Sequence, residues 1–217
     1  MADQDKTAIL IILDRSGSMA YPKGFREDME GGMNTFITEQ AKLPGKCRAT
    51  VVQFDDKYEE VVVDAKLKDV PTIEIMPRGG TALLDAMGKS ITNLRDHINS
   101  MPRAKRPAKI IVAIVTDGQE NSSREWNKGK VSTLVKDLTD KGWEFTYLGA
   151  NQDAIAEATS LGIRTANAVT YTSKGATSTL SSFTNNASAY RSGIASDVSY
   201  SAAQRVAAVD GYEDGSN

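Results

Sequence analysis

The chain has 217 residues, of which 40% are hydrophobic and 25% are charged. These fractions are typical of a soluble globular protein, and the length suits one domain with additional segments. The net charge of −2 excludes a strongly basic nucleic-acid-binding protein. The single cysteine, Cys47, excludes a disulfide framework and any zinc site built on paired cysteines. Because no apolar run reaches the ~18 residues of a membrane span and no signal peptide is evident, we expect a cytoplasmic protein.

Four segments have the pattern of strands. Residues 7–13 and 109–115 are almost continuously apolar and rich in β-branched side chains, which is typical of central parallel strands covered on both faces. Residues 144–148 predict a third strand that ends before Gly149. Residues 50–54 and 60–63 flank a polar turn and predict an antiparallel pair at one edge of the sheet.

Helical periodicity separates these strands. An apolar face with steps of three and four residues predicts one helix over residues 84–98, and similar spacing predicts others over 25–37 and 131–138. The sequence from Ser122 to Glu125 is typical of a capping box that starts the 131–138 helix, and Gly142 would end it. The alternation predicts an α/β fold in three layers. Its sheet is doubly wound and mostly parallel, with helices on both faces and one antiparallel edge strand.

The composition changes near residue 171. We expect a domain over residues 1–171, followed over 172–203 by a Ser- and Thr-rich helical extension that packs on it. Its apolar positions keep helical spacing: Ala176, Leu180, Phe183, Ala187 and Tyr190. The alternative is a flexible segment that docks only on a partner. Residues 204–217 are predicted to be a disordered tail, because the chain from Asp210 onward lacks apolar surface.

Oxygen-bearing side chains follow the two buried strands. Asp14, Ser16 and Ser18 come directly after the first strand, and Asp117 follows the second. Thr81 comes after two glycines at a predicted helix start. Each feature alone is typical of a turn or a helix cap. Because loops at the carboxyl ends of parallel strands meet at one crevice, and Mg²⁺ prefers oxygen ligands, the five residues together predict a metal site.

This five-residue set resembles that of a von Willebrand factor type A domain with a metal-ion-dependent adhesion site. The family pattern is Asp-x-Ser-x-Ser on one loop, a threonine on a second and an aspartate on a third, and the likeness extends over residues 7–170. The chain resembles free-standing bacterial and phage members of this family. The resemblance implies a Rossmann-like fold in which Ser16, Ser18 and Thr81 bind the cation directly, while Asp14 and Asp117 act through water. It also implies that a partner protein supplies a Glu or Asp to the metal.

The predicted function is therefore a metal-dependent protein-binding module that uses Mg²⁺, with Mn²⁺ or Ca²⁺ as possible replacements. We expect no nucleic-acid or membrane partner, and the sequence leaves the oligomeric state open. We do not expect an enzyme, because Ser16 stands where Asp-x-Asp phosphatases have a second carboxylate and no Gly-x-Ser-x-Gly motif is present. The alternatives are a structural or assembly protein with a stabilising metal site and, least favoured, a metal-dependent hydrolase.

Two further residues are candidates near the site. Arg15 either steers a partner carboxylate toward the metal or is a solvated loop charge, and the sequence favours neither. Asn151, just past the third strand, either borders the site or bonds to its own backbone.

Overall fold

The computed structural model describes residues 2–150 and 153–210, which form one six-stranded sheet in the order β3-β2-β1-β4-β5-β6. Every neighbouring pair is parallel except β2 and β3, so β3 is an antiparallel edge strand. The predicted α/β fold is confirmed. The strands are β1 (Asp3–Asp14), β2 (Lys46–Phe54), β3 (Tyr58–Lys66), β4 (Pro107–Thr116), β5 (Trp143–Ala150) and β6 (Ala168–Tyr171).

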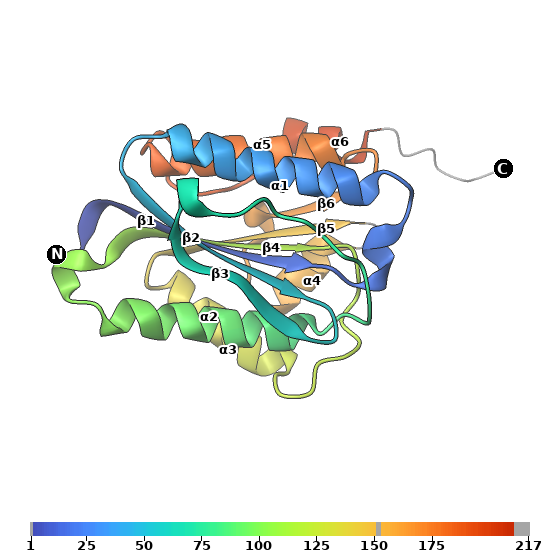
Figure 1. The fold of residues 1–217 in the computed structure, drawn as a ribbon, viewed down its shortest axis with the longest axis horizontal. Helices are drawn as coiled ribbons and strands as arrows, with labels where there is room; N and C mark the ends of the chain where they lie inside the picture. The colour runs from blue at the N-terminus through green and yellow to red at the C-terminus, as the bar shows by residue number, and fades with distance from the viewer. Residues whose placement is uncertain (1, 151–152, 211–217) are drawn as a thin grey trace.

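Helices cover both faces of this sheet (Figure 1). One face carries α1 (Phe25–Lys42), α5 (Ala176–Arg191) and α6 (Ala202–Val209). The other carries α2 (Leu83–Ser100), α3 (Lys128–Thr139) and α4 (Ala154–Ser160). Short 3₁₀ turns complete the chain: η1 (Gly17–Ala20), η2 (Leu67–Asp69), η3 (Arg103–Lys105) and η4 (Thr165–Asn167). In the described part of the chain, no helix is both long and apolar enough to cross a membrane.

The central strand β1 is buried on both faces. Ile9, Ile11 and Leu13 point toward the layer of α1 and α5, whereas Leu10 and Ile12 point toward the layer of α2. Successive side chains of a strand alternate between the faces of the sheet, so a strand between two helical layers needs apolar residues at every position. The continuous apolar run of the sequence reflects this environment.

Helix α5 packs on α1. The rings of Phe36 and Phe183 stack at a centroid distance of 4.4 Å, and both are fully buried. Gly32 in α1 allows this approach, because a Cβ at that position would collide with Leu180. The hydrophobic core therefore continues from the sheet through α1 into α5, across the predicted boundary at residue 171.

Three short elements have no counterpart in the sequence-based prediction: α4, β6 and α6. Residues 204–209, predicted as the start of a disordered tail, are helical instead. A capping box starts α6, in which Ser201 Oγ accepts from the Gln204 amide and Gln204 Oε1 accepts from the Ser201 amide. Arg205 donates to the carbonyl oxygens of Thr165 and Ala166, which fixes α6 beside β6. The remainder of the predicted tail, residues 211–217, lies outside the described residues.

A side chain of α2, and not the predicted capping box, fixes the loop that follows β4. The Asp85 carboxylate accepts hydrogen bonds from the amides of Arg124, Glu125 and Trp126 at 2.8–2.9 Å. The predicted capping box at Ser122–Glu125 is therefore wrong. Helix α3 begins at Lys128, and Asn127 caps it by accepting from the amide of Lys130 at 3.0 Å. Burial raises the pKa of Asp85, but the three amide donors outweigh it and hold the pKa below its usual value.

Replacing Phe183 with alanine tests the docking of α5. We expect Phe183→Ala to lower the free energy of unfolding by about 3–5 kcal/mol, because it leaves a cavity against Phe36. Urea unfolding measures this change. The matched control is Ile194→Ala, since Ile194 is 84% exposed and its loss should change stability by no more than about 0.5 kcal/mol. Equal stabilities of the two variants would contradict a docked α5.

Replacing Asp85 with asparagine tests the loop anchor. A carboxylate whose pKa is lowered by folding stabilises the protein above its unfolded pKa of about 3.9, and the effect is lost as the pH falls through the folded pKa. We expect Asp85→Asn to cost about 1.5–3 kcal/mol at pH 7, because charge-assisted hydrogen bonds to three amides are weakened. The difference from the wild type should shrink below about pH 4. A pH-independent difference between the unfolding curves would refute the role of the charge.

Candidate functional site

Three loops meet at the carboxyl edge of the sheet. Strands β1 and β4 are parallel neighbours with Leu13 opposite Val115, so Asp14 and Asp117 leave the sheet side by side. The third loop runs from β3 to α2 and contains Gly79, Gly80 and Thr81. It is tied to the first loop, because the Gly17 amide donates to the Gly79 carbonyl oxygen at 3.2 Å. The topology thus brings all three predicted loops to one place.

Direct hydrogen bonds join four of the five predicted residues. Asp14 Oδ1 accepts from the Ser16 amide at 2.6 Å, and the hydroxyls of Ser16 and Ser18 are 3.0 Å apart. Ser18 Oγ donates to Asp117 Oδ1 at 2.8 Å. The other carboxylate oxygen of Asp14 accepts from Thr116 Oγ1 at 2.5 Å. Two carboxylates and two hydroxyls therefore form one connected cluster.

Thr81 lies beside this cluster, next to the backbone of Gly118. A Cβ at Gly118 would lie 2.8 Å from Thr81 Oγ1 and 3.5 Å from Ser16 Oγ. Only glycine leaves the two hydroxyls open toward each other at this point, because any side chain would crowd the Thr81 hydroxyl. Thr81 itself is held by Asn121, which accepts from the Thr81 amide through Oδ1 at 2.9 Å. No local pattern in the sequence indicated this anchoring role of Asn121.

The two carboxylates lie in a poorly solvated place. Asp14 is fully buried, and burial raises its pKa despite hydrogen bonds from Thr116 and Ser16. Burial and the nearby charge of Asp14 raise the pKa of Asp117 to about 6. Within the described ranges, neither carboxylate forms an ion pair with a Lys, Arg or His. The cluster is therefore a concentration of negative charge without a compensating side chain.

The donor chemistry fits a hard divalent cation. The described residues contain no group of three or more His, Cys, Asp or Glu side chains that could hold a metal by themselves. The oxygen donors of the cluster are instead three hydroxyls and two carboxylates, the donor type that Mg²⁺, Mn²⁺ and Ca²⁺ accept. A cation here would meet the two uncompensated carboxylates, and the hydroxyls of Thr81 and Ser16 both lie near the backbone of Gly118.

Arg15 has neither of the roles considered for it. Its side chain is buried, with Nε 2.9 Å from Asp55 Oδ2 and Nη1 2.5 Å from Glu59 Oε2. It ties the first loop to the β2–β3 hairpin and does not point to solvent. The half-exposed cation beside it is Arg78, whose Nε lies 2.7 Å from Asp55 Oδ2. The sequence suggested only a turn at Asp55, and no pattern indicated that two arginines share it.

One other feature borders the site. A polar cavity of about 670 Å³ lies next to the Thr81 loop, between the β2–β3 turn, the start of α2 and residues 121–125. Asn151, considered as a bordering residue, lies outside the described residues.

The fold resembles several solved structures. The proximal thread matrix protein 1 from the mussel byssus matches with a TM-score of 0.62 and 16% identity, over 81% of this chain and 46% of that one. This chain thus spans less than half of the mussel protein, of which another structure has a zinc-occupied MIDAS motif. The manganese-loaded TRAP protein of Plasmodium vivax matches with a TM-score of 0.53 and 15% identity, over 81% of this chain and 72% of that one. The vWF domain of the type V pili tip protein Mfa5 from Porphyromonas gingivalis matches with a TM-score of 0.55 and 10% identity, over 87% of this chain and 93% of that one.

At these identities, the solved structures support the fold alone. No match is found among curated protein sequences. The family model of the von Willebrand factor type A domain, however, matches residues 8–186, which is most of the chain and reaches into α5. The chain therefore belongs to the von Willebrand factor type A domain family.

Proposed function

We propose that this protein is a metal-dependent protein-interaction module whose carboxyl-edge loops capture an acidic side chain of a partner. The observation that carries the proposal is a cluster of oxygen donors from three loops, in which Asp14, Ser16, Ser18 and Asp117 are joined by hydrogen bonds and Thr81 lies beside Gly118. The family membership supports it, as do the zinc-occupied and manganese-loaded sites of the mussel and Plasmodium proteins.

The hydroxyls of Ser16, Ser18 and Thr81 would hold a divalent cation directly, with Mg²⁺ as the proposed ion. Asp14 and Asp117 would act mainly through bound water. When bound, the cation supplies a positive charge that neutral hydroxyls leave largely uncompensated, and a Glu or Asp of another protein can then bind to it. The chain's own part is to hold these groups in position, through Thr116 on Asp14 and Asn121 on Thr81.

The surroundings of the site suit a protein partner. Ser18 is exposed, so the cluster is reachable from solvent. The polar cavity beside Thr81 is lined by both basic and acidic side chains, and one of the basic ones, Lys89, is ion-paired with Glu125 at 2.7 Å. Lys57 and Arg124 form no ion pair within the described part of the chain and could pair with further carboxylates of an acidic partner segment.

We propose binding rather than catalysis. The site has serines but no histidine beside them: His97 lies on α2, where its Nε2 is 3.4 Å from Asp64 Oδ2 at the β3 edge. A serine nucleophile needs an adjacent base, and the hydrogen-bonded partners of Ser16 and Ser18 are each other and a carboxylate. A cytoplasmic location stays a prediction of the sequence.

Titration with Mn²⁺ and Mg²⁺ tests the metal part of the proposal. We expect Ser18→Ala and Thr81→Val to weaken Mn²⁺ binding at least about tenfold in isothermal titration calorimetry. Loss of a residue that only hydrogen-bonds to a metal ligand typically lowers metal affinity about 10–100-fold, and loss of a direct ligand should cost at least as much. Valine is chosen at position 81 because Thr81 is 3% exposed and alanine would also remove packing. Thr133→Val, on the exposed side of α3, is the matched control and should bind as the wild type does.

Affinity capture from the source cells then tests the partner part. Candidate partners are proteins that the wild type retains in Mg²⁺ but that are lost when a chelator is added or when Ser18→Ala replaces the wild type in Mg²⁺. We expect each such partner to bind through one essential Glu or Asp, which alanine substitution in the partner identifies. Unchanged Mn²⁺ affinity in both variants would overturn the metal assignment. Normal metal binding and a raised melting temperature, with no protein retained in a metal-dependent way, would favour the alternative of a structural protein with a stabilising metal site.

A further inference from the structure

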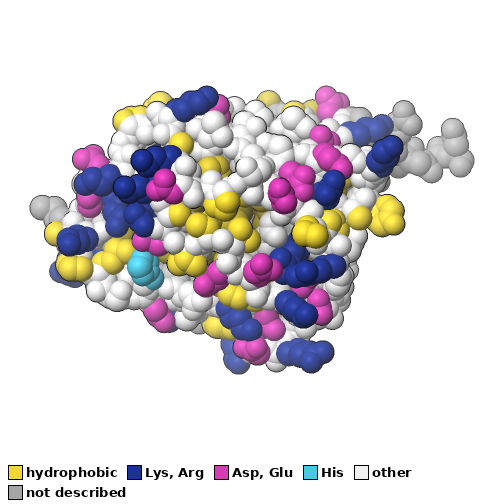
Figure 2. Space-filling model, viewed as in Figure 1, with side chains coloured by type: hydrophobic (Ala, Val, Ile, Leu, Met, Phe, Trp, Pro, Cys, Tyr) yellow, Lys and Arg dark blue, Asp and Glu magenta, His cyan; other side chains and the backbone are white. Residues whose placement is uncertain are grey.

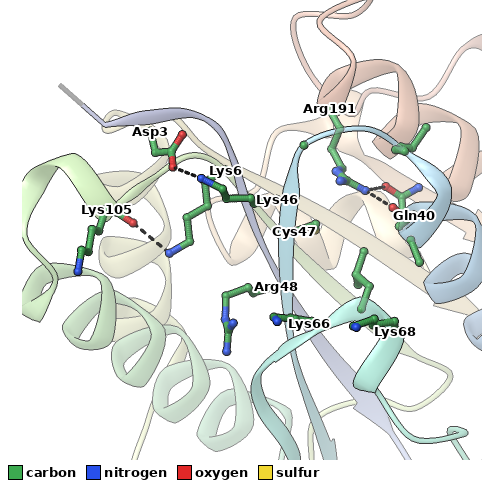
Figure 3. A pocket seen from close by; sticks show the side chains of 14 residues that line it. Asp3, Lys6, Gln40, Lys46, Cys47, Arg48, Lys66, Lys68, Lys105 and Arg191 are labelled. Atoms are coloured by element: carbon green, nitrogen blue, oxygen red, sulfur yellow. Dashed lines mark hydrogen bonds and ion pairs between the residues drawn. The ribbon is translucent and has the colours of Figure 1, made fainter.

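A second cavity lies at the opposite edge of the sheet from the candidate metal site. It has a volume of about 560 Å³ and opens between the starts of β1 and β2, the end of α1, η2, η3 and the last residue of α5. Figure 3 shows its lining side chains. Lys6, which lines this cavity, and Asp14 both lie on β1 and are eight residues apart, or roughly 26 Å at ~3.3 Å per residue. The two sites are thus well separated.

The lining of this cavity is strongly basic, although the whole chain has a net charge of −2. Seven Lys or Arg residues line it, against one acidic residue, Asp3. In Figure 2 several of the dark blue side chains gather at the left, the end at which β1 starts. Two of the seven are ion-paired: Lys46 lies 3.4 Å from Asp3 Oδ2, and Arg48 lies 2.8 Å from Asp64 Oδ2.

The other five cations have no carboxylate within ion-pairing distance in the part of the chain that the structure describes. Lys6 Nζ donates to the Lys105 carbonyl oxygen at 3.0 Å, and Lys66 and Lys68 project from the end of β3 and from η2 as exposed residues. Like charges held around one hollow repel each other, and an anion inside it would relieve that repulsion. The cavity is therefore suited to a ligand with more than one negative charge.

Arg191 is the most informative of these cations. Its Nη1 donates to the backbone oxygen and to the side-chain oxygen of Gln40, at 2.7 and 3.0 Å, and both acceptors are neutral. Gln40 is itself fully buried and fixed by donating to Thr184 O and Ser188 Oγ. The Arg191 Nε is buried with no hydrogen-bond partner among the described residues. The Arg191 guanidinium is thus held at the cavity by neutral acceptors that leave its charge unbalanced, which favours an anion beside it.

The floor of the cavity is apolar. Ala41, Leu43, Cys47 and Leu67 line it between the cations. Inorganic ions would leave this surface unused, whereas a ligand with an organic ring could cover it. The volume is within the range of ~300–1,000 Å³ that is typical of small-molecule sites, and the charges surround one hollow instead of following a track.

We propose that this amino-edge pocket binds a small organic polyphosphate of nucleotide size, with the phosphates on the Lys66, Lys68 and Arg191 side and the organic part on the apolar floor. The site is independent of the metal site. The amino-edge pocket would bind its ligand without a divalent cation, so this domain would have two separate ligands.

The test uses ADP as the probe, added to the full chain in the presence of EDTA so that the metal site plays no part. We expect ADP to bind in isothermal titration calorimetry, with an affinity that falls as the salt concentration rises. Lys66→Gln combined with Lys68→Gln should weaken ADP at least tenfold. Both lysines are exposed, so the fold is expected to persist, and thermal unfolding checks it. Lys130→Gln with Lys136→Gln, two exposed lysines of α3, is the matched control and should leave the affinity unchanged.

Three further probes locate the recognised group. Pyrophosphate should bind more weakly than ADP, and adenosine should not bind. Absence of ADP binding at millimolar concentration, or equal affinity in the double variant and the wild type, would overturn the proposal. Pyrophosphate binding as tight as that of ADP would overturn the organic part. A duplex DNA that binds more tightly than ADP, displaces it and fails to bind the Lys66/Lys68 variant would assign the pocket to nucleic acid instead.

Discussion

The parallel pairing of β1 with β4 is the interaction on which the candidate metal site depends. Its register puts Leu13 opposite Val115, so Asp14, the last residue of β1, and Asp117, which follows the end of β4, lie at the same end of the sheet. This placement brings the fully buried carboxylate of Asp14 near that of Asp117, and no Lys, Arg or His among the described residues pairs with either. Burial raises the pKa of both carboxylates, and the charge of Asp14 raises the pKa of Asp117 further. The two strands are buried and apolar on both faces, and their packing against both helical layers holds the arrangement in place.

The site also needs the hairpin at the edge of the sheet. Arg15 and Arg78 converge on the buried carboxylate of Asp55, which joins the first loop, the hairpin and the Thr81 loop. Breaking a buried ion pair by removing one partner is costly, because it leaves a charge without compensation. The cluster that would hold the cation is thus surrounded by contacts that fix its loops, and Asp85 does the same for the loop after β4.

The two ends of the central strands differ in charge. The carboxyl edge presents Asp14 and Asp117, whereas the amino edge presents unpaired lysines and Arg191 around an apolar floor. Parallel strands make this division possible, because all their carboxyl ends lie at one edge and all their amino ends at the other. A net charge near zero therefore conceals two regions of opposite sign, each suited to ligands of the other sign.

The sequence by itself determined the strands of the centre, the long amphipathic helices and the five oxygen-bearing residues, because continuous apolar runs, helical spacing and a spaced motif are all local signals. The tertiary structure decided the rest. Ser122 and Glu125 had the local pattern of a helix start, but Asp85 from another helix took up the backbone amides there. The helix at 202–209 depends on β6 and on Gly175 beside it, and the burial of Arg15 depends on Asp55, 40 residues away. Such contacts join residues that are distant in the chain, so no local pattern carries them.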